Sequence, residues 1–219
     1  MKSKSYENLQ KILGGLVRFI FRVHGHNVEN EPGDGEGQYI IVSNHISNVD
    51  PILICSILKK QQPHYMAKKS LFKIPLLRGI IKAMGAFPVN RGGADVNAIK
   101  HAIKLLEDGK CVGIFPQGHR YPGEDPRNTR TKNGMALIAT KAQANIVPAY
   151  IWRKNNRFRL FRRTYIILGD MIPFESLGYD PEASGEYARI TNVVFDKICD
   201  IGEEFERERK EKKNKKRKA

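Results

Sequence analysis

The chain has 219 residues, of which 41% are hydrophobic and 28% charged, so it suits one folded domain with appended ends and not a disordered protein. Its 38 Lys and Arg against 23 Asp and Glu give a net charge of +15, which predicts an anionic partner: nucleic acid, phospholipid head groups or a phosphorylated substrate. The three cysteines are scattered, which disfavours a disulfide framework or a zinc site and suits a reducing cytosol.

The first expected element is a basic amphipathic helix between Tyr6 and Val23, with hydrophobic residues at helical spacing and basic residues on a separate stripe. Arg18 and Arg22 interrupt the apolar run, which argues against a signal peptide. No run in the chain reaches the length of a membrane span. The helix therefore either packs its apolar face on the domain or lies in the interface of an anionic bilayer. A loop over Asn30–Gly37 follows it.

From residue 39, short β-rich runs alternate with helical patterns, which predicts one α/β domain with a largely parallel central sheet flanked by helices. Strands are expected over Tyr39–Ser43, His64–Lys68, Ala86–Asn90, Cys111–Phe115 and Ile146–Ile151, with a longer strand or hairpin over Arg157–Leu168. Helices are expected over Pro51–Lys59, Ile74–Met84, Val96–Glu107, Gly134–Ala144 and Ser184–Glu211. Pro148 within its strand indicates an edge, a bulge or backbone turned toward a cleft.

These patterns divide the chain into three parts. Residues 1–37 form the interface helix and its loop, residues 38–206 form the domain, and residues 207–219 form a basic tail. The tail carries nine basic and two acidic residues and has no apolar face. It is expected to be a frayed extension of the last helix, either solvated or lying on an anionic surface, with nucleic-acid contact as its main competing role.

A histidine and an aspartate stand five positions apart directly after the first strand of the domain. A carboxylate that holds one ring nitrogen of His45 would leave the other free to take a proton from a substrate hydroxyl, and Asp50 supplies such a carboxylate. No Gly-x-Ser-x-Gly elbow is present, so the nucleophile is expected to be the substrate's own hydroxyl. A structural alternative is that Asp50 caps the helix that begins at Pro51.

Polar groups also follow two other strands. Arg91 stands at the tip of a glycine turn, where its guanidinium could contact a phosphate in a two-pronged fashion, although exposed arginines are common. The turn over residues 116–120 presents Gln117, His119 and Arg120 at a strand end, and Arg120 could share a phosphate with Arg91. Lys132, just before a helix, could add a cation and helix N–H groups to the same anion site, or be merely solvated.

Four segments in this order resemble the motifs of the glycerolipid acyltransferases, most closely the bacterial 1-acylglycerol-3-phosphate (lysophosphatidate) acyltransferases. The resemblance spans roughly residues 39–174. The family's Asn-His-x-x-x-x-Asp motif is matched by Asn44, His45 and Asp50, and its phosphate-binding second motif by Phe87–Arg91. The third motif, usually Phe-Pro-Glu-Gly-Thr-Arg, stands here as Phe115–Arg120, and the fourth, an apolar strand with proline, as Ile146–Ala149.

The resemblance implies that His45 deprotonates the glycerol hydroxyl of a lysophospholipid, that Asp50 orients the ring, and that the oxygen attacks the thioester of acyl-CoA or acyl-carrier protein. Arg91 and Arg120 would hold the phosphate, with Gln117, Gly118 and Lys132 completing the site for phosphate and glycerol. No metal or cofactor is needed. Gln117 replaces the usual glutamate by a neutral amide, and His119 replaces threonine, so the acceptor is less firmly predicted than the reaction.

The leading hypothesis is therefore an enzyme of phospholipid biosynthesis that makes phosphatidate while bound, as a peripheral protein, to the cytoplasmic face of the membrane. A related alternative is transfer to glycerol-3-phosphate or another lysolipid. The alternative from another class is a non-catalytic basic protein that binds membrane or nucleic acid. The excess of positive charge favours that alternative, but the motifs clustered at strand ends do not. The basic tail also has no aromatic residues between its lysines and arginines that could stack on bases, so nucleic acid is not expected as a partner.

Overall fold

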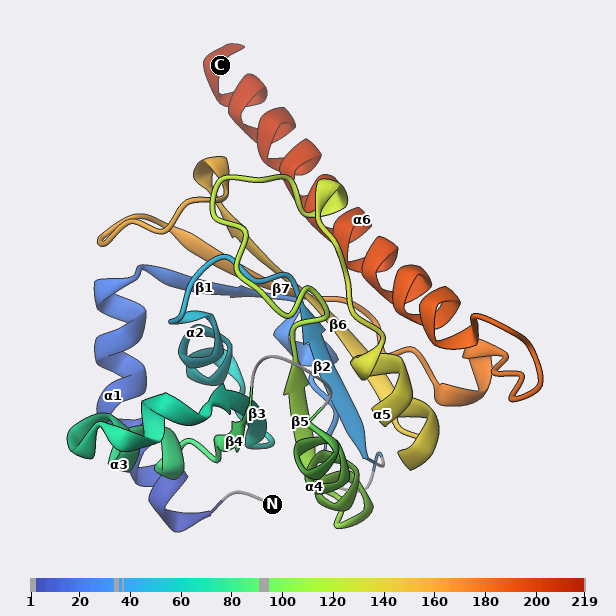
Figure 1. Ribbon diagram of the computed structural model, residues 1–219. Coiled ribbons are helices and arrows are strands. Elements are labelled where there is room, and N and C mark those ends of the chain that lie inside the picture. The colour runs from blue at the N-terminus through green and yellow to red at the C-terminus, as the bar shows by residue number, and fades with distance from the viewer. Residues whose placement is uncertain (1–2, 34–35, 37, 91–94, 219) are drawn as a thin grey trace.

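The computed structural model describes residues 3–33, 36, 38–90 and 95–218 and has one central sheet with helices on both faces (Figure 1). The strands are β1 (Val23–His26), β2 (Tyr39–Ser43), β3 (Pro63–Lys68), β4 (Phe87–Val89), β5 (Cys111–Ile114), β6 (Asn145–Arg153) and β7 (Thr164–Leu168). They lie across the sheet in the order β1-β7-β6-β2-β5-β3-β4. Neighbouring strands are parallel, except that β7 and β6 are antiparallel. The predicted α/β domain with a largely parallel sheet is therefore confirmed.

Helices bury apolar residues against both faces of the sheet, in two separate clusters. Helices α4 (Val96–Glu107), α5 (Gly134–Ala142) and α6 (Glu186–Lys218) cover one face, and α1 (Lys4–Ile20) and α2 (Asp50–Ile57) cover the other. Helix α3 (Pro75–Ala83) lies near α1. The short 3-10 helices are η1 (Val28–Asn30), η2 (Lys69–Lys73), η3 (Pro126–Asn128), η4 (Lys154–Asn156) and η5 (Phe174–Leu177).

The sequence patterns locate most elements to within a few residues. The bounds predicted for β2 and α4 are those observed, and α4 begins where the Asp95 side chain accepts a hydrogen bond from the Ala98 N–H. Two predictions were wrong. The first helix was expected to reach Val23 but ends at Ile20. Val23 instead begins strand β1, which was not predicted. Only Thr164–Leu168 of the segment expected to be a longer strand or hairpin is a strand.

Strand β6 lies inside the sheet, between β2 and β7, and Pro148 is therefore not at an edge. Pro148 pairs with Val42 on the β2 side, while the ladder with β7 begins only at Ala149. The Gly169 N–H donates to the Pro148 carbonyl over 2.8 Å, so Pro148 faces the β7 side one residue before that ladder and, because it lacks an N–H, cannot return the hydrogen bond.

Helix α1 is fixed to the domain through its polar side chains and leaves apolar ones exposed. Gln10 Nε2 donates to the Cys55 carbonyl over 2.8 Å, and Arg18 Nη1 donates to the Ser56 carbonyl over 2.7 Å. These contacts satisfy carbonyl groups at the end of α2 that lack partners within that helix. On another side of α1, Ile12, Leu16 and Phe19 are 73%, 51% and 75% exposed. None of the helices in the described part of the chain is long and apolar enough to span a bilayer.

The last helix is longer than predicted. It begins two residues after the expected start at Ser184 and continues to Lys218, so the basic tail extends α6 as helix. Figure 1 shows this end of α6 projecting beyond the sheet. Spaced pairs such as Lys212 with Glu208, whose side chains are 3.3 Å apart, support the helix in a segment with few apolar residues.

Candidate active site

The predicted pair of His45 and Asp50 forms in the loop after β2. His45 Nδ1 lies 2.9 Å from Asp50 Oδ2. Asp50 is completely buried, and 9% of the His45 surface is exposed. Since an ionised carboxylate accepts hydrogen bonds, Asp50 places the proton of a neutral His45 ring on Nδ1. The other ring nitrogen, Nε2, is then the basic one, and no described residue forms a hydrogen bond with it.

Asp50 does not cap α2, so the structural alternative for this residue was wrong. Its Oδ2 atom turns back onto the preceding loop and accepts the N–H groups of Ile46 and Ser47, each over 2.6 Å. Three donors thus converge on one buried carboxylate oxygen. An oxygen atom bonded in this way is held in one orientation, from which the carboxylate can orient an imidazole.

Gln117 holds the backbone of His45. Its Oε1 atom accepts the His45 N–H over 2.6 Å, and its Nε2 atom donates to Thr129 Oγ1 over 2.6 Å. The side chain is 2% exposed. The Tyr121 N–H donates to the His45 carbonyl over 2.9 Å, so both backbone polar groups of His45 are fixed by the loop after β5. A direct role of Gln117 on substrate stays a prediction. The support from Thr129 had no sequence signal, since threonine is common in loops.

Aromatic rings fix the plane of the imidazole. The Phe115 ring stacks on the His45 ring with centroids 4.1 Å apart and an interplanar angle of 15°. Tyr65 stacks behind Phe115 at 5.5 Å, and it fits there because residue 113 is glycine: a Cβ on Gly113 would lie 2.1 Å from the Tyr65 ring. The histidine is thus oriented from one face by packing and from its edge by Asp50.

Asn44 anchors the loop of His45 to β6. Its Oδ1 atom accepts the Ile151 N–H over 2.7 Å, and its Nδ2 atom donates to the Ile151 carbonyl over 3.1 Å. The residue is fully buried. This two-point contact continues the β2–β6 pairing by a side chain after the β2 backbone has left the sheet. It explains why the position beside the histidine needs an amide with one donor and one acceptor.

The predicted anion-binding residues are only partly brought together. Gly118 has a φ of +65°, and a Cβ there would lie 3.0 Å from Lys132 Cδ, so the lysine stem passes close to the turn. The Lys132 N–H donates to the Pro116 carbonyl over 2.7 Å. Arg120 is exposed on the same loop. Arg91, the other predicted phosphate ligand, lies outside the described residues.

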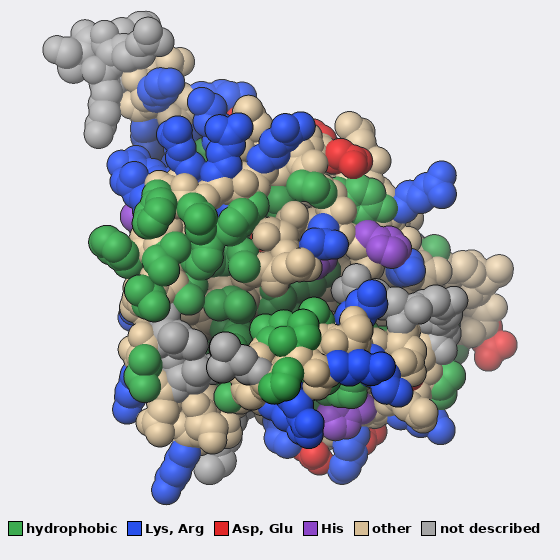
Figure 2. All heavy atoms as spheres, turned by 60° about the vertical axis from the view of Figure 1, so that its left-hand side comes forward, with side chains coloured by type: hydrophobic (Ala, Val, Ile, Leu, Met, Phe, Trp, Pro, Cys, Tyr) green, Lys and Arg blue, Asp and Glu red, His purple; other side chains and the backbone are tan. Residues whose placement is uncertain are grey.

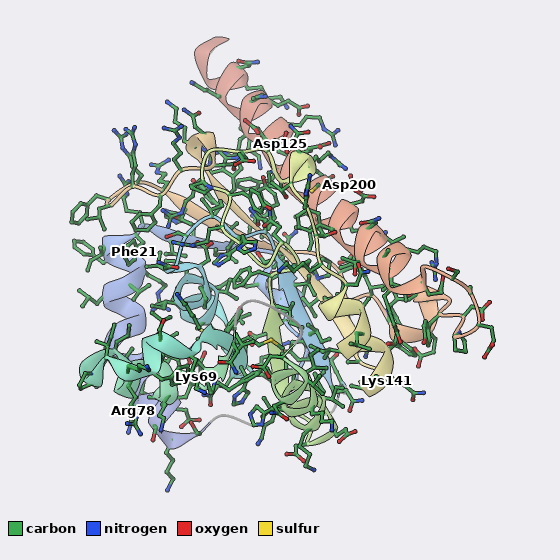
Figure 3. All side chains as sticks on the ribbon, in the orientation of Figure 1. Phe21, Lys69, Arg78, Asp125, Lys141 and Asp200 are labelled. Carbon is green, nitrogen blue, oxygen red and sulfur yellow. The ribbon has the colours of Figure 1, made fainter. Side chains whose placement is uncertain are left out.

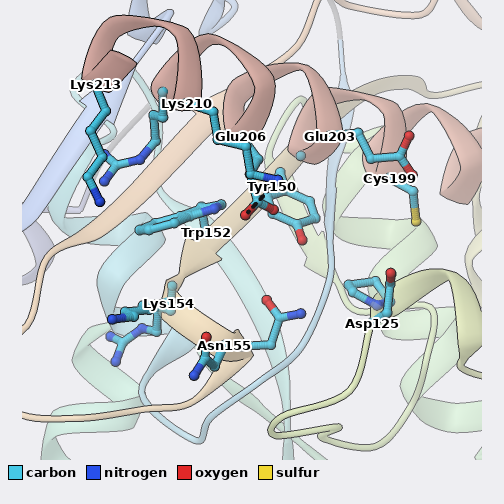
Figure 4. A pocket seen from close by; sticks show the side chains of 15 residues that line it. Asp125, Tyr150, Trp152, Lys154, Asn155, Cys199, Glu203, Glu206, Lys210 and Lys213 are labelled. Carbon is cyan, nitrogen blue, oxygen red and sulfur yellow. Dashed lines mark ion pairs between the residues drawn. The ribbon is translucent and has the colours of Figure 1, made fainter. Parts of the chain in front are cut away.

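A cavity of about 440 Å³ lies elsewhere, between α6, the end of β6 and the loop of Asp125 (Figure 4). Tyr150 and Trp152 line it, and both belong to the apolar cluster under α6. Ile46, which follows His45, belongs to the cluster on the opposite face of the sheet. This cavity is therefore distinct from the space next to His45.

Comparisons with known proteins add to this geometry. The sequence model of the Acyltransferase family matches residues 20–152. The chain is 30% identical over 199 residues to a 1-acyl-sn-glycerol-3-phosphate acyltransferase of Bacillus subtilis, covering 88% of this chain and 96% of that protein. It is 34% identical over 142 residues to a protein of the same name from Streptococcus pneumoniae, covering 62% of this chain and 51% of that protein. In fold it is similar to the crystal structure of the acyltransferase PlsC from Thermotoga maritima, with a TM-score of 0.70 and 23% identity over 93% of this chain and 79% of that one.

Proposed function

This chain belongs to the acyltransferase family, as its motifs predicted, and from that premise we propose that it acylates the sn-2 hydroxyl of 1-acylglycerol-3-phosphate to give phosphatidate. The observation that carries the proposal is the buried carboxylate that holds His45 with Nε2 open. The names of the relatives support lysophosphatidate as the acceptor.

In the proposed reaction, His45 Nε2 takes the proton of the acceptor hydroxyl as its oxygen attacks the carbonyl carbon of an acyl thioester. The carbon–sulfur bond then breaks, and the leaving thiolate of CoA or acyl-carrier protein takes the proton from the His45 imidazolium, which restores the neutral base. Asp50 stabilises the imidazolium between these steps, and a positioned base of this kind contributes about 10²- to 10⁴-fold to the rate. The residues named here need no resident metal or cofactor for these steps.

The phosphate of the acceptor is assigned to the cations near the turn after β5. Lys132 and Arg120 are both exposed, and the N-terminus of α5 begins at Gly134, two residues after Lys132. Lysine and arginine side chains together with helix N–H groups form a common kind of phosphate site. Arg91 is proposed as a further ligand from the motif alone. An anchored phosphate would hold the glycerol hydroxyl near the base, which is a large part of the catalytic effect of such sites.

The test is thiol release from acyl-CoA or acyl-carrier protein in the presence of lysophosphatidate and phospholipid vesicles. His45→Ala should lose nearly all turnover while its thermal unfolding stays cooperative. His101→Ala is a matched control, because His101 is exposed on α4 and lies edge-on to Phe87. Glycerol-3-phosphate and other lysolipids as acceptors distinguish the related activities. Wild-type turnover retained by folded His45→Ala protein would contradict the catalytic role of His45.

We also propose that the protein binds peripherally to the cytoplasmic face of an anionic membrane through one apolar surface. Leu160 and Phe161, in the loop before β7, are 55% and 60% exposed. The Phe161 N–H donates to the Ile20 carbonyl over 3.0 Å, which joins this loop to the end of α1. Together with Ile12, Leu16 and Phe19 of α1 they form what we call the apolar surface. Figure 2 shows hydrophobic side chains gathered on the side of the molecule where α1 lies.

Basic residues flank the apolar surface. Arg159, Arg162 and Arg163 are exposed on either side of Leu160 and Phe161. Side chains of this kind near anionic lipid contribute about 1 kcal/mol each, and the apolar residues add the free energy of leaving water. This combination favours a bilayer over nucleic acid as the anionic partner, because nucleic-acid surfaces do not select exposed aliphatic and phenyl groups in this arrangement.

Point substitutions test this surface better than removal of α1, because α1 also satisfies the end of α2. Phe19→Glu with Phe161→Glu should abolish co-sedimentation with vesicles that contain anionic lipid. Val96→Glu is the matched control, since Val96 is 57% exposed on α4, across the sheet from α1. Equal vesicle binding by the double variant and the wild type would contradict this assignment of the surface.

A further inference from the structure

The cavity of about 440 Å³ between α6 and the end of β6 has an aromatic wall (Figure 4). Trp152 lines the cavity and is half-buried, so part of its indole ring remains open. Tyr150 lines it as well, and its ring lies close under α6 because residue 202 is glycine: a Cβ on Gly202 would lie 2.4 Å from the Tyr150 ring. A space of this size beside flat rings suits a ligand that carries a planar ring of its own.

Basic side chains surround the end of the cavity at Trp152. Figure 4 shows Lys154 on one side of the indole and Lys210 and Lys213 of α6 on the other. The Arg209 guanidinium stacks on the indole, with its central carbon 4.2 Å from a ring centroid. Within the described part of the chain, Lys154, Arg209 and Lys213 form no ion pair. Their charges are therefore free to attract an anionic ligand.

The acidic residues that line the cavity are already held by partners. Glu203 forms an ion pair with Arg127, and Asp125 Oδ1 accepts the Arg127 N–H over 3.0 Å. Glu206 Oε1 lies 3.8 Å from Lys210 Nζ. These contacts use up much of the negative charge, and the end of the cavity at Trp152 keeps its excess of positive charge.

A short loop joins this cavity to the loop of His45, at the edge of the sheet where the parallel strands β2 and β6 both end. The Tyr121 N–H donates to the His45 carbonyl, and Asp125, four residues later, lines the cavity. Between them, the Gly123 N–H donates over 2.7 Å to the carbonyl of Asn156, which also lines the cavity. Four residues of chain span at most about 14 Å. The wall of the cavity at Asp125 thus lies within that distance of a residue bonded to His45.

We propose that this cavity binds the adenosine phosphate end of acyl-CoA, with the adenine ring against Trp152 and the phosphates between Lys154 and the lysines of α6. The inference rests on the proposed function, because it gives a place to the acyl donor. Lysine side chains bind phosphates as charge-assisted donors, and the indole supplies a stacking surface for a purine. The extended pantetheine arm of CoA is longer than the span from Asp125 to Tyr121. A donor held here therefore brings its thioester over the edge of the sheet to His45.

The position of the cavity favours a nucleotide over a lipid head group. It lies under α6, whereas the apolar surface assigned to the membrane is carried in large part by α1, on the other face of the sheet. A lipid phosphate would satisfy the lysines but would leave the aromatic wall without a partner. A purine nucleotide uses both the ring and the cations.

The first experiment uses the fluorescence of Trp152, which is the only tryptophan in the sequence. Titration with CoA, which has no acyl group and cannot turn over, should quench this fluorescence in a saturable way. Adenosine 3′,5′-bisphosphate should quench it as well, and pantetheine, which lacks the nucleotide, should not. CoA should bind more tightly than ATP. No saturable quenching by CoA, equal quenching by pantetheine, tighter binding of ATP, or quenching by anionic vesicles alone would each overturn the proposal.

Charge reversal tests the cations. Lys154→Glu with Lys213→Glu should weaken the affinity for CoA about tenfold or more while thermal unfolding is unchanged, because both side chains are exposed. Lys100→Glu with Lys141→Glu is the matched control, since it makes the same change of charge at exposed sites on α4 and α5. Figure 3 shows Lys141 well away from Asp125. An equal loss of affinity in the control would show that only the net charge of the protein matters and would overturn the proposal.

Kinetics connect this site to the donor. In the thiol-release assay, the Lys154→Glu Lys213→Glu variant should raise KM for acyl-CoA by about the factor by which it weakens CoA binding, with a smaller effect on kcat. An unchanged KM, or turnover with acyl-carrier protein and none with acyl-CoA, would overturn the assignment of the cavity to the donor. The fluorescence titration needs no turnover, so it separates the two proposals. A protein that binds CoA at Trp152 but transfers no acyl group would contradict only the proposed function.

Discussion

Asp50→Asn should separate the effect of the negative charge of Asp50 from the effect of its shape. Asparagine has nearly the same volume and keeps an oxygen that can accept a hydrogen bond, but it has no negative charge. With Nδ1 and Oδ2 2.9 Å apart, the centres of charge of an imidazolium and the carboxylate are separated by about 4 Å. At an effective dielectric constant of about 20, their attraction is about 4 kcal/mol.

That attraction is present only when His45 carries the proton, so its loss raises the barrier of the proton-transfer step. A loss of about 4 kcal/mol lowers kcat/KM by about 10³-fold. The stability of the fold should fall as well, because the Oδ2 atom accepts three hydrogen bonds. Hydrogen bonds to a charged group contribute about 1 kcal/mol more each than those to a neutral one, so the free energy of unfolding should decrease by about 3 kcal/mol.

Thiol release with saturating acyl-CoA and varied lysophosphatidate gives kcat/KM, and urea denaturation gives the free energy of unfolding. Asp170→Asn is the control, because Asp170 is exposed and its Oδ1 atom accepts a hydrogen bond from Asn30 Nδ2 over 2.9 Å. The control should match the wild type in both measurements. Asp50→Asn with kcat/KM within tenfold of the wild type would refute the argument that the carboxylate acts by stabilising an imidazolium.

Three further results are expected. Gln117→Glu should keep kcat/KM within about tenfold, because a carboxylate can still accept the His45 N–H, and the Thr129 hydroxyl can turn from the Pro126 carbonyl to donate a hydrogen bond to the carboxylate; a total loss of thiol release would show that the amide is required. The ion pair with Arg189 lowers the pKa of Glu186 to about 2, so its stabilising effect is present above about pH 4.5 and is lost as the pH falls toward 2. Glu186→Gln should therefore flatten the decrease of the urea midpoint over that pH range, and an unchanged slope would contradict this. The three cysteines are buried, so a thiol reagent should modify none of them in the native protein and all three in guanidinium chloride; rapid native reaction would contradict their burial.

The sequence predicted elements where local signals agree with the tertiary structure. Strand β2 is a continuous apolar run that the sheet buries on both faces, and α4 combines an aspartate cap with apolar residues at helical spacing. Strand β1 was missed because only Val23 of its four residues is buried, and its Val-His-Gly-His segment has little strand signal. It is a strand because it pairs with β7, about 140 residues away in the chain.

The contact between His45 and Asp50 was predicted because both residues lie in one short loop, which a spacing argument can reach. The other roles arise from contacts that sequence does not reveal. Gln117 binds the backbone of His45 from 72 positions away, and Phe115, which follows β5, stacks on the His45 ring. The structural alternative, in which Asp50 caps α2, was wrong because its Oδ2 atom contacts three donors in the preceding loop.

The connection between β6 and β7 carries Leu160 and Phe161. Because β2 and β6 are parallel, this connection leaves the sheet at the same edge as the loop with His45. A protein resting on a bilayer through these side chains therefore holds its base close to the plane of the lipid head groups. A lysolipid can then offer its free hydroxyl while its hydrocarbon tail stays among its neighbours, so the enzyme need not extract its acceptor into water before each turnover.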